Sequence, residues 1–236
     1  MRNKFFLMVC IFPLAVMGCM GPKYSIPLPA SNTEGQNESM LEFLNIYPEE
    51  FKLSQHIIMK VKGKEYEFIG YLVVKGKKGF RALAFGEMGG KIFDFLEWDG
   101  KREVVTKPDA MSSSPLFDGV IGDISHLYDS GQFEDAFTSM NNGNMMILVL
   151  RKQGNRVAEY NFSKGGNLKL SMEALDGRLV REVKYEDFRL YPGWAKPLPS
   201  RITLINHRWH YELRIELFKI DVGPVDEKIF LNNKKE

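Results

Sequence analysis

A succession of short β-rich runs, separated by glycine and charged turn residues, is the feature that most constrains the fold of this 236-residue chain. The runs begin near residue 55 and continue almost to the C-terminus. Short runs joined by tight turns are typical of an antiparallel sheet. We predict strands over residues 55–61, 65–74, 80–85, 91–98, 103–106, 145–151, 156–162, 168–172, 179–185, 201–205 and 211–219.

The turns and the side-chain alternation within the runs agree with this prediction. The segments with hairpin-turn composition are Lys62-Gly63-Lys64, Asp99-Gly100, Gly154-Asn155, Gly165-Gly166 and Asp176-Gly177. Apolar residues alternate at Tyr66, Phe68, Leu72 and Val74, at Leu168, Leu170 and Met172, and at Leu213, Ile215 and Leu217. Alternation indicates that one face of the sheet is packed and that the other is at least partly wet.

Helical spacing occurs in three segments. In the middle of the chain, Ser112–Ser114 and Pro115 have the pattern of a helix start. The apolar stripe that follows consists of Leu116, Phe117, Val120, Ile121, Ile124, Leu127 and Tyr128. A second, shorter helix is predicted from Phe133, Ala136, Phe137 and Met140, and another within residues 38–53 from Met40, Phe43, Leu44 and Tyr47, with a break at Pro48.

These elements predict an α+β fold that is mainly antiparallel β. It is a curved sheet, or half-open barrel, with helices covering its concave face. Sequence pattern does not distinguish a filled interior from one that is hollow and admits a ligand. From alternation and helix phase we predict that the interior is lined by Phe68, Leu72, Ala82, Ala84, Phe93, Phe95, Val120, Ile124, Ile147, Leu170 and Ile215.

The first residues have the organisation of a signal peptide. Arg2 and Lys4 precede an apolar run over residues 5–16, which is too short to span a bilayer of about 30 Å. The run ends in Val16-Met17-Gly18-Cys19, where a small residue before a cysteine is typical of a lipoprotein cleavage site. We predict a signal peptide over residues 1–18 and lipidation of Cys19; an ordinary secretory signal is the alternative.

Cleavage changes the composition of the mature chain. Arg2 and Lys4 leave with the signal, so 30 Lys+Arg balance 30 Asp+Glu, and the mature chain gives no electrostatic reason to expect nucleic acid as a partner. Cys19 is the only cysteine left, so no disulfide is expected. We predict a flexible tether over residues 19–37, a domain over 38–222 with a helical insert at about 114–140, and a tail over 223–236. We expect a monomer.

Known catalytic motifs are absent from the sequence. It has no Gly-x-Ser-x-Gly elbow, no phosphate-binding loop and no metalloprotease helix motif, so we expect no enzymatic activity and no cofactor. His207 and His210 lack a third metal ligand nearby and are interpreted as hairpin residues. Carboxylate pairs such as Asp118 with Asp123, or Glu134 with Asp135, are interpreted as the solvated face of the helical insert.

Two segments resemble a known family. Residues 80–93 (FRALAFGEMGGKIF) are similar to the third strand, loop and fourth strand of the LolA/LolB-like outer-membrane lipoprotein family, in particular its LolB-type lipoprotein receptors. Residues 198–204 (LPSRITL) and 211–217 resemble the closing hairpin of that family. An uncharacterised lipoprotein family of the same fold is an alternative assignment.

This resemblance implies a cavity that accepts acyl chains and a site for loop contact with lipid. Met88 falls on the protruding apolar residue of the family's loop, although it is equally well explained as a simple turn residue. The implied partners are a membrane, reached through the lipid anchor, acyl chains or lipoproteins, and a periplasmic carrier protein. Because Met20 follows the predicted lipidated Cys19, the expected location is the periplasmic face of the outer membrane. The alternative function is a non-enzymatic interaction or lipid-sensing module.

Overall fold

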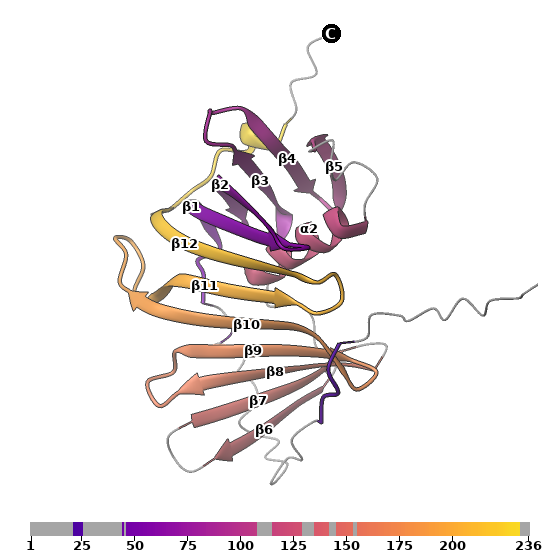
Figure 1. Cartoon of the computed structure of the whole chain (residues 1–236). Coiled ribbons are helices and arrows are strands. Elements are labelled where there is room, and N and C mark those ends of the chain that lie inside the picture. Colours follow the sequence, from indigo (N-terminus) through magenta and orange to yellow (C-terminus); the bar gives the residue numbers. More distant parts are fainter. Residues whose placement is uncertain are drawn as a thin grey trace, which may run out of the picture.

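The computed structural model describes residues 21–25, 44, 46–107, 115–128, 135–141, 145–152 and 155–231. Within these residues, twelve strands form one antiparallel sheet in the order β5-β4-β3-β2-β1-β12-β11-β10-β9-β8-β7-β6 (Figure 1). The strands are β1 (Glu50–Val61), β2 (Lys64–Lys75), β3 (Gly79–Phe85), β4 (Lys91–Trp98), β5 (Lys101–Thr106), β6 (Asp135–Asn141), β7 (Met145–Lys152), β8 (Arg156–Ser163), β9 (Leu168–Leu175), β10 (Arg178–Arg189), β11 (Leu198–Asn206) and β12 (Tyr211–Val222). The sheet curves and stays open between β5 and β6, which confirms the predicted half-open architecture.

The sheet consists of two meanders, β1 to β5 and β6 to β12, in which each strand pairs with its neighbour in sequence. One long-range pairing joins them. β1 lies antiparallel to β12 along its whole length, from Phe51 opposite Val222 to Val61 opposite Tyr211. All eleven predicted strands are present, and most extend beyond the predicted ends because pairing continues into the turns.

Left-handed backbone conformations close several of the tight turns. Lys62 and Gly63 both have positive φ, as do Asp99 and Gly100, and Asp176 and Gly177. Two successive residues with positive φ define the turn that matches the twist of a two-stranded ribbon, and Asn, Asp and Gly adopt it most readily. The hairpin-turn signals in the sequence are therefore confirmed at these three positions.

Helix α2 (Pro115–Tyr128) covers one face of the sheet, which we call the helix-side face; the other is the outer face. Phe117, Ile121 and Ile124 pack against side chains of β1 to β4. Leu127, one turn further on, packs against β1 and β8 to β12. The predicted apolar stripe is thus confirmed, and the helix bridges both halves of the sheet. In the described part of the chain, no helix combines the length and apolar character needed to span a membrane.

Two predicted helices are wrong within the described residues. The segment that contains Ala136, Phe137 and Met140 is strand β6, which pairs with β7 from Asp135 opposite Arg151 to Asn141 opposite Met145. An isolated helix of this length is marginal, whereas the hairpin pairs the exposed edge of β7. Within the helical insert predicted at about 114–140, the helix therefore ends at Tyr128.

The helix predicted within residues 38–53 is replaced near its end by a strand. Residues 46–49 are irregular, and β1 already begins at Glu50. Phe51 and Leu53 are buried in β1, which pairs with β2 on one side and with β12 on the other. Their alternating spacing is that of a strand, and it determines the structure of this end of the segment. Met40 and Phe43 lie outside the described residues, as do Ser112–Ser114 and Phe133.

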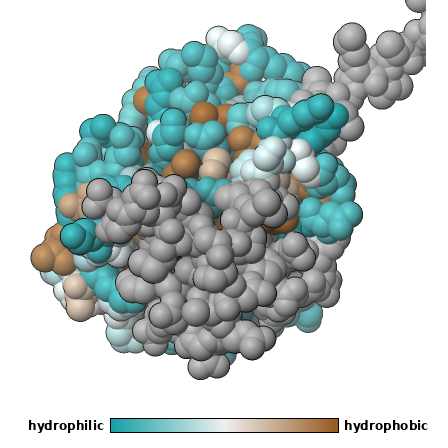
Figure 2. Space-filling model, turned by 90° about the horizontal axis from the view of Figure 1, so that it is seen from below, coloured by the Kyte–Doolittle hydropathy of each residue, from teal (hydrophilic) through white to brown (hydrophobic). Residues whose placement is uncertain are grey.

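The C-terminal segment, predicted to be a tail, packs on the outer face. A short 3₁₀ turn at Glu227–Ile229 places Phe230 on Trp98, with the ring centroids 4.5 Å apart. Val225 and Phe230 are buried against Val73 and Leu96, which explains the apolar residues on the outer side of β2 and β4. In Figure 2, which views the molecule from the β6 end, the coloured part of the surface is mostly hydrophilic with small hydrophobic patches.

Part of the predicted tether is also ordered on the sheet. Residues 21–25 lie beside the turn between β9 and β10, where Lys23 forms a β-bridge with Arg178. The prediction that residues 19–37 are flexible throughout is therefore wrong for this stretch, because its backbone is hydrogen-bonded to β10 and the preceding turn.

We expect Phe230→Ala to lower the free energy of unfolding by about 3 kcal/mol, the usual cost of removing a buried aromatic ring. The matched control is Leu231→Ala, because Leu231 is 57% exposed. It should change the stability by less than about 0.5 kcal/mol. Urea unfolding followed by tryptophan fluorescence measures both. Equal effects would show that the C-terminal segment does not stabilise the domain.

Candidate functional site

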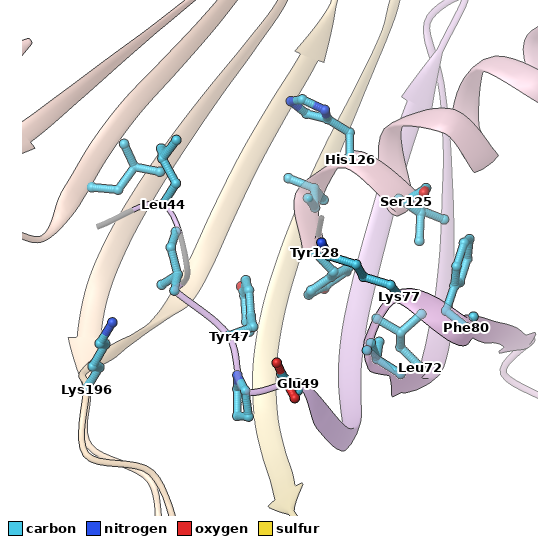
Figure 3. A pocket seen from close by; sticks show the side chains of 18 of the residues that line it. Leu44, Tyr47, Glu49, Leu72, Lys77, Phe80, Ser125, His126, Tyr128 and Lys196 are labelled. Atoms are coloured by element: carbon cyan, nitrogen blue, oxygen red, sulfur yellow. The ribbon is translucent and has the colours of Figure 1, made fainter. Parts of the chain in front are cut away.

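A pocket of about 1130 Å³ lies between the helix-side face and the C-terminal end of α2 (Figure 3). Residues 46–49, together with Leu44, cross the sheet before β1 and form a further wall. The apolar and aromatic lining consists of Leu44, Ile46, Tyr47, Leu72, Val74, Phe80, Ile124, Leu127, Tyr128, Tyr160, Leu168, Tyr185 and Trp194. This volume slightly exceeds the range of about 300–1,000 Å³ common for small-molecule sites. Polar side chains, among them Glu97, Ser125 and His126, share the lining with the apolar and aromatic ones.

Specific contacts hold the wall formed by residues 46–49 in place. Tyr47 meets Tyr128 edge to face at 4.8 Å between ring centroids and stacks on Phe51 at 5.6 Å. The indole of Trp194 donates a hydrogen bond to the Ile46 carbonyl oxygen at 3.1 Å. Because these contacts come from α2, β1 and the β10–β11 connection, they fix the wall on three sides. Trp194 also lines this pocket.

The buried tyrosines do not bring charge into the pocket. Burial raises the pKa of Tyr47, Tyr128 and Tyr185 above the ordinary tyrosine value. The Tyr128 hydroxyl donates to the Gln55 side-chain oxygen at 2.8 Å, and the Tyr185 hydroxyl lies 3.5 Å from the Ser171 hydroxyl. These phenols are therefore neutral at physiological pH and interact with other protein groups.

Charged residues of the lining come mainly from the connections at one edge of the sheet. We call this the pocket edge; it comprises residues 76–78, 99–100, 164–167 and 190–197. Lys77 and Lys196 stand on these connections, and Glu49 precedes β1 at the same edge. All three are exposed. The pocket therefore has an apolar interior and charged groups where the strands end.

Several of the predicted lining residues belong to a filled part of the same core. Leu72 and Ile124 line the pocket. The residues Ala82, Ala84, Phe93, Phe95 and Ile215 are buried on the helix-side face, and Phe68 and Val120 pack against the core from partly buried positions. Ring contacts such as Phe93 with Phe117, at 5.3 Å, fill the space under the first half of α2. The hollow part of the core begins near the other end of the helix.

The prediction for Leu170 is wrong because β9 contains an irregularity. Phe162 pairs with Leu168, but Asn161 pairs with Leu170, so the strand gains a residue between the two pairs. A one-residue shift moves later side chains to the opposite face. Leu168 consequently lines the pocket, whereas Leu170 lies on the outer face beside Lys184. Ile147 belongs to β7 opposite Asn161, and its side chain lies outside the described residues.

Met88 is fully exposed in the loop between β3 and β4. The loop is closed by hydrogen bonds from the Gly86 amide to the Gly90 carbonyl and from the Gly89 amide to the Gly86 carbonyl. Phe80, which lines the pocket, stands near the other end of β3. The seven residues of β3 span about 20 Å along the strand. Met88 and the pocket edge therefore lie at opposite ends of this strand.

A buried polar cluster holds α2 on the sheet beyond the pocket. Asp123 of α2 accepts hydrogen bonds from Arg181 at 2.6 Å, from Asn206 at 2.7 Å and from the hydroxyl of Tyr211. Arg181 also forms an ion pair with the buried Glu173. The interpretation of Asp123 as part of a solvated face is therefore wrong. Its position within the apolar stripe was the signal that it needs a buried partner.

The remaining titratable residues that the sequence singled out do not form a site. Asp118 is exposed on α2, and His207 and His210 both lie in the turn between β11 and β12. The side chains of Glu134 and Asp135 lie outside the described residues. In the part of the chain that the structure describes, no group of three His, Cys, Asp or Glu side chains is arranged to hold a metal ion.

Comparison with known proteins identifies the fold by structure alone, since no family model and no curated protein matches the sequence. A LolA superfamily protein from Nitrosomonas europaea superposes with a TM-score of 0.63 at 14% identity, over 83% of this chain and 97% of the other. A DUF1329 family protein from Desulfovibrio piger gives 0.57 at 13% identity, covering 84% and 97% of the two chains. A putative outer membrane lipoprotein-sorting protein domain from Vibrio parahaemolyticus gives 0.53 at 10% identity, covering 83% and 94%. The chain therefore has the LolA/LolB-like fold.

We expect Arg181→Met to destabilise the protein by about 3–5 kcal/mol, because it leaves Asp123 buried without a cation and Glu173 with only Arg156, at 3.4 Å. Lys184→Met is the matched control on the same strand. Lys184 is about half exposed and pairs with Glu182 only at 3.5 Å, so its loss should cost less than about 1 kcal/mol. Urea unfolding of the two variants checks this difference. A cost for Arg181→Met as small as that of the control would contradict the assigned role of the cluster.

Proposed function

We propose that this protein is a lipid-anchored envelope lipoprotein that binds acyl chains of lipids or lipoproteins in its pocket, without chemical turnover. The observation that carries the proposal is the apolar pocket of about 1130 Å³ on the helix-side face of an open sheet. Its walls are side chains from both halves of the sheet, from α2 and from residues 46–49. An elongated apolar ligand fits this composition better than a small polar substrate does.

The energetics of the pocket agree with an acyl ligand. Each methylene group removed from water contributes about 0.8 kcal/mol, so a long chain has a large driving force even after the entropy cost of binding. The neutral tyrosines place no charge among the apolar side chains. Charged groups at the pocket edge, such as Lys77, stand where the polar end of a ligand would lie.

The sequence supports an anchor at Cys19 and a location at the periplasmic face of the outer membrane. The signal over residues 1–18 ends in a small residue before the cysteine, and Met20 follows it. One structural neighbour is described as a putative outer membrane lipoprotein-sorting protein domain. By analogy with this fold, the exposed Met88 is the residue we propose for contact with lipid during transfer of a lipoprotein or lipid from a periplasmic carrier.

Titration of the soluble chain, beginning at Met20, with a fluorescent fatty acid tests the pocket. We expect Ile46→Glu to weaken binding at least tenfold, because it places a carboxylate on the pocket wall. A tenfold change corresponds to about 1.4 kcal/mol. Val104→Glu is the matched control, since Val104 is 43% exposed on β5 and lines no part of the pocket; its affinity should equal that of the unmodified chain.

Circular dichroism of both variants checks that they are folded. A folded parent chain that ignores acyl probes, and that yields no lipid when it is extracted after purification, would refute the lipid-binding function. The fold would then be better explained as an interaction or sensing module. Equal weakening by the two glutamate substitutions would place the binding site outside the pocket.

Metabolic labelling with an alkyne analogue of palmitate tests the anchor. We expect the label on the expressed full-length chain and no label on Cys19→Ser, which removes the acyl acceptor. The control is Cys10→Ser, because Cys10 lies within the signal and should not affect labelling. Membrane flotation should follow the same pattern. Labelling that persists in Cys19→Ser would contradict anchoring at this residue.

A further inference from the structure

The residues just after the proposed lipid attachment site are docked on the sheet. The Tyr24 amide donates to the Gly177 carbonyl at 2.9 Å, and the Leu179 amide donates to the Pro22 carbonyl at 2.9 Å. Lys23 forms the bridge with Arg178 between them. Residues 21–24 therefore extend the backbone pairing at the turn between β9 and β10.

Side-chain contacts make this docking specific. The Tyr24 hydroxyl donates to the carboxylate of Glu159, which is buried and also accepts a hydrogen bond from Asn161 at 2.8 Å. Gly21 is tightly enclosed, because a Cβ atom there would lie 1.9 Å from the Leu179 carbonyl oxygen and 3.2 Å from the His207 side chain. Only glycine permits this close approach of the two backbones.

The docking site belongs to the sheet edge opposite the pocket edge. We call it the anchor edge, and it comprises the turns at residues 62–63, 86–90, 176–177 and 207–210. The antiparallel register places turns 62–63 and 207–210 side by side, since Val61 lies opposite Tyr211. Phe85, the last residue of β3, pairs with Ile69, so the loop at 86–90 lies toward the same edge but is set back from turn 62–63 by about five residues of β2. The fully exposed Met88 is on this edge.

Charge on the anchor edge suits a membrane surface. The exposed cations on and beside these turns are Lys23, Lys62, Lys64, Lys91 and Arg208, and the exposed anions are Glu65, Glu87 and Asp176. Lys91 is paired with the buried Asp94 at 2.9 Å. Lysine and arginine side chains near an anionic bilayer each contribute about 1 kcal/mol of attraction. An exposed methionine among them can enter the apolar layer, while the cations stay at the headgroups.

We propose that the anchor edge lies on an anionic lipid bilayer and that the docked residues 21–24 fix this orientation, so that the pocket opens away from the membrane. This rests on the proposed acylation of Cys19, which stands two residues before Gly21. Two residues reach about 7 Å at most, whereas the twelve residues of β1 separate the two edges by about 40 Å. Cys19 itself therefore stays near the anchor edge while residues 21–24 are docked.

Depth-dependent fluorescence quenching on the full, acylated protein tests the orientation. Single-cysteine labels are introduced by Met88→Cys on the anchor edge and by Leu190→Cys on the pocket edge, where Leu190 is 71% exposed. The acylated Cys19 does not react with the label. In vesicles of phosphatidylethanolamine and phosphatidylglycerol that contain acyl-chain quenchers, we expect the label at position 88 to be quenched several-fold more than the label at position 190. Equal or reversed quenching would overturn the proposal.

A second pair of variants tests the role of the docked residues. Gly21→Val cannot dock without moving the Leu179 backbone, so it should reduce the difference in quenching between the two labels while the protein still floats with the vesicles. Ser25→Val is the matched control, because Ser25 is exposed just after the docked residues, and it should preserve the difference. An unchanged difference in Gly21→Val would show that docking does not set the orientation.

These readouts separate this proposal from the proposed function. Flotation reports the anchor, and fatty-acid titration of the soluble chain reports the pocket. Hydrogen exchange of the Leu179 amide reports docking: protection in the soluble parent chain and its loss in Gly21→Val are expected. Failure to float would overturn the orientation together with the anchor. Normal flotation and normal ligand binding with equal quenching would overturn the orientation alone.

Discussion

The pairing of β1 with β12 is the interaction on which the rest of this structure depends. The other ladders join strands that follow one another in sequence, whereas this one joins residues about as far apart as the domain allows. It turns two meanders into one continuous curved sheet. Because the helix-side faces of both halves then meet, α2 can contact β1 to β4 with one end and β8 to β12 with the other. Long-range pairing of this kind is slow to form, since loop-closure entropy must be overcome first.

The helix divides the interior into a filled part and a hollow part. Aromatic side chains such as Phe93 and Phe117 fill the space under its first half, and the pocket opens near its last turn. Beyond the pocket, Asp123 meets Arg181 from the sheet. Buried charges of this kind add little net stability over apolar packing, but removing one partner is costly. The cluster therefore fixes where the helix lies, and so how much of the concave face remains open.

The two edges of the sheet carry different features, and this division gives the proposed function a direction. Residues 21–24, the turns with exposed lysines and Met88 lie on one edge, while the charged groups of the pocket lie on the other. A protein attached through the first edge presents the second to the periplasm, where a carrier would arrive. In the proposed orientation, docking of residues 21–24 holds Cys19 near the anchor edge, at the opposite end of the strands from the pocket edge.

The sequence by itself determined the strands, their turns and the apolar stripe of α2, because alternation, tight-turn residues and helical periodicity are local properties. Its LolB-like segments also indicated the fold that structural comparison shows. Tertiary structure alone decided the rest. It made a strand of residues 135–141 because β7 offered an edge, turned Leu170 outward through one extra residue in β9, and buried Asp123 against Arg181. It also docked residues 21–24 and Phe230 on the sheet. These outcomes depend on partners distant in sequence, and no local pattern specifies which surfaces will meet.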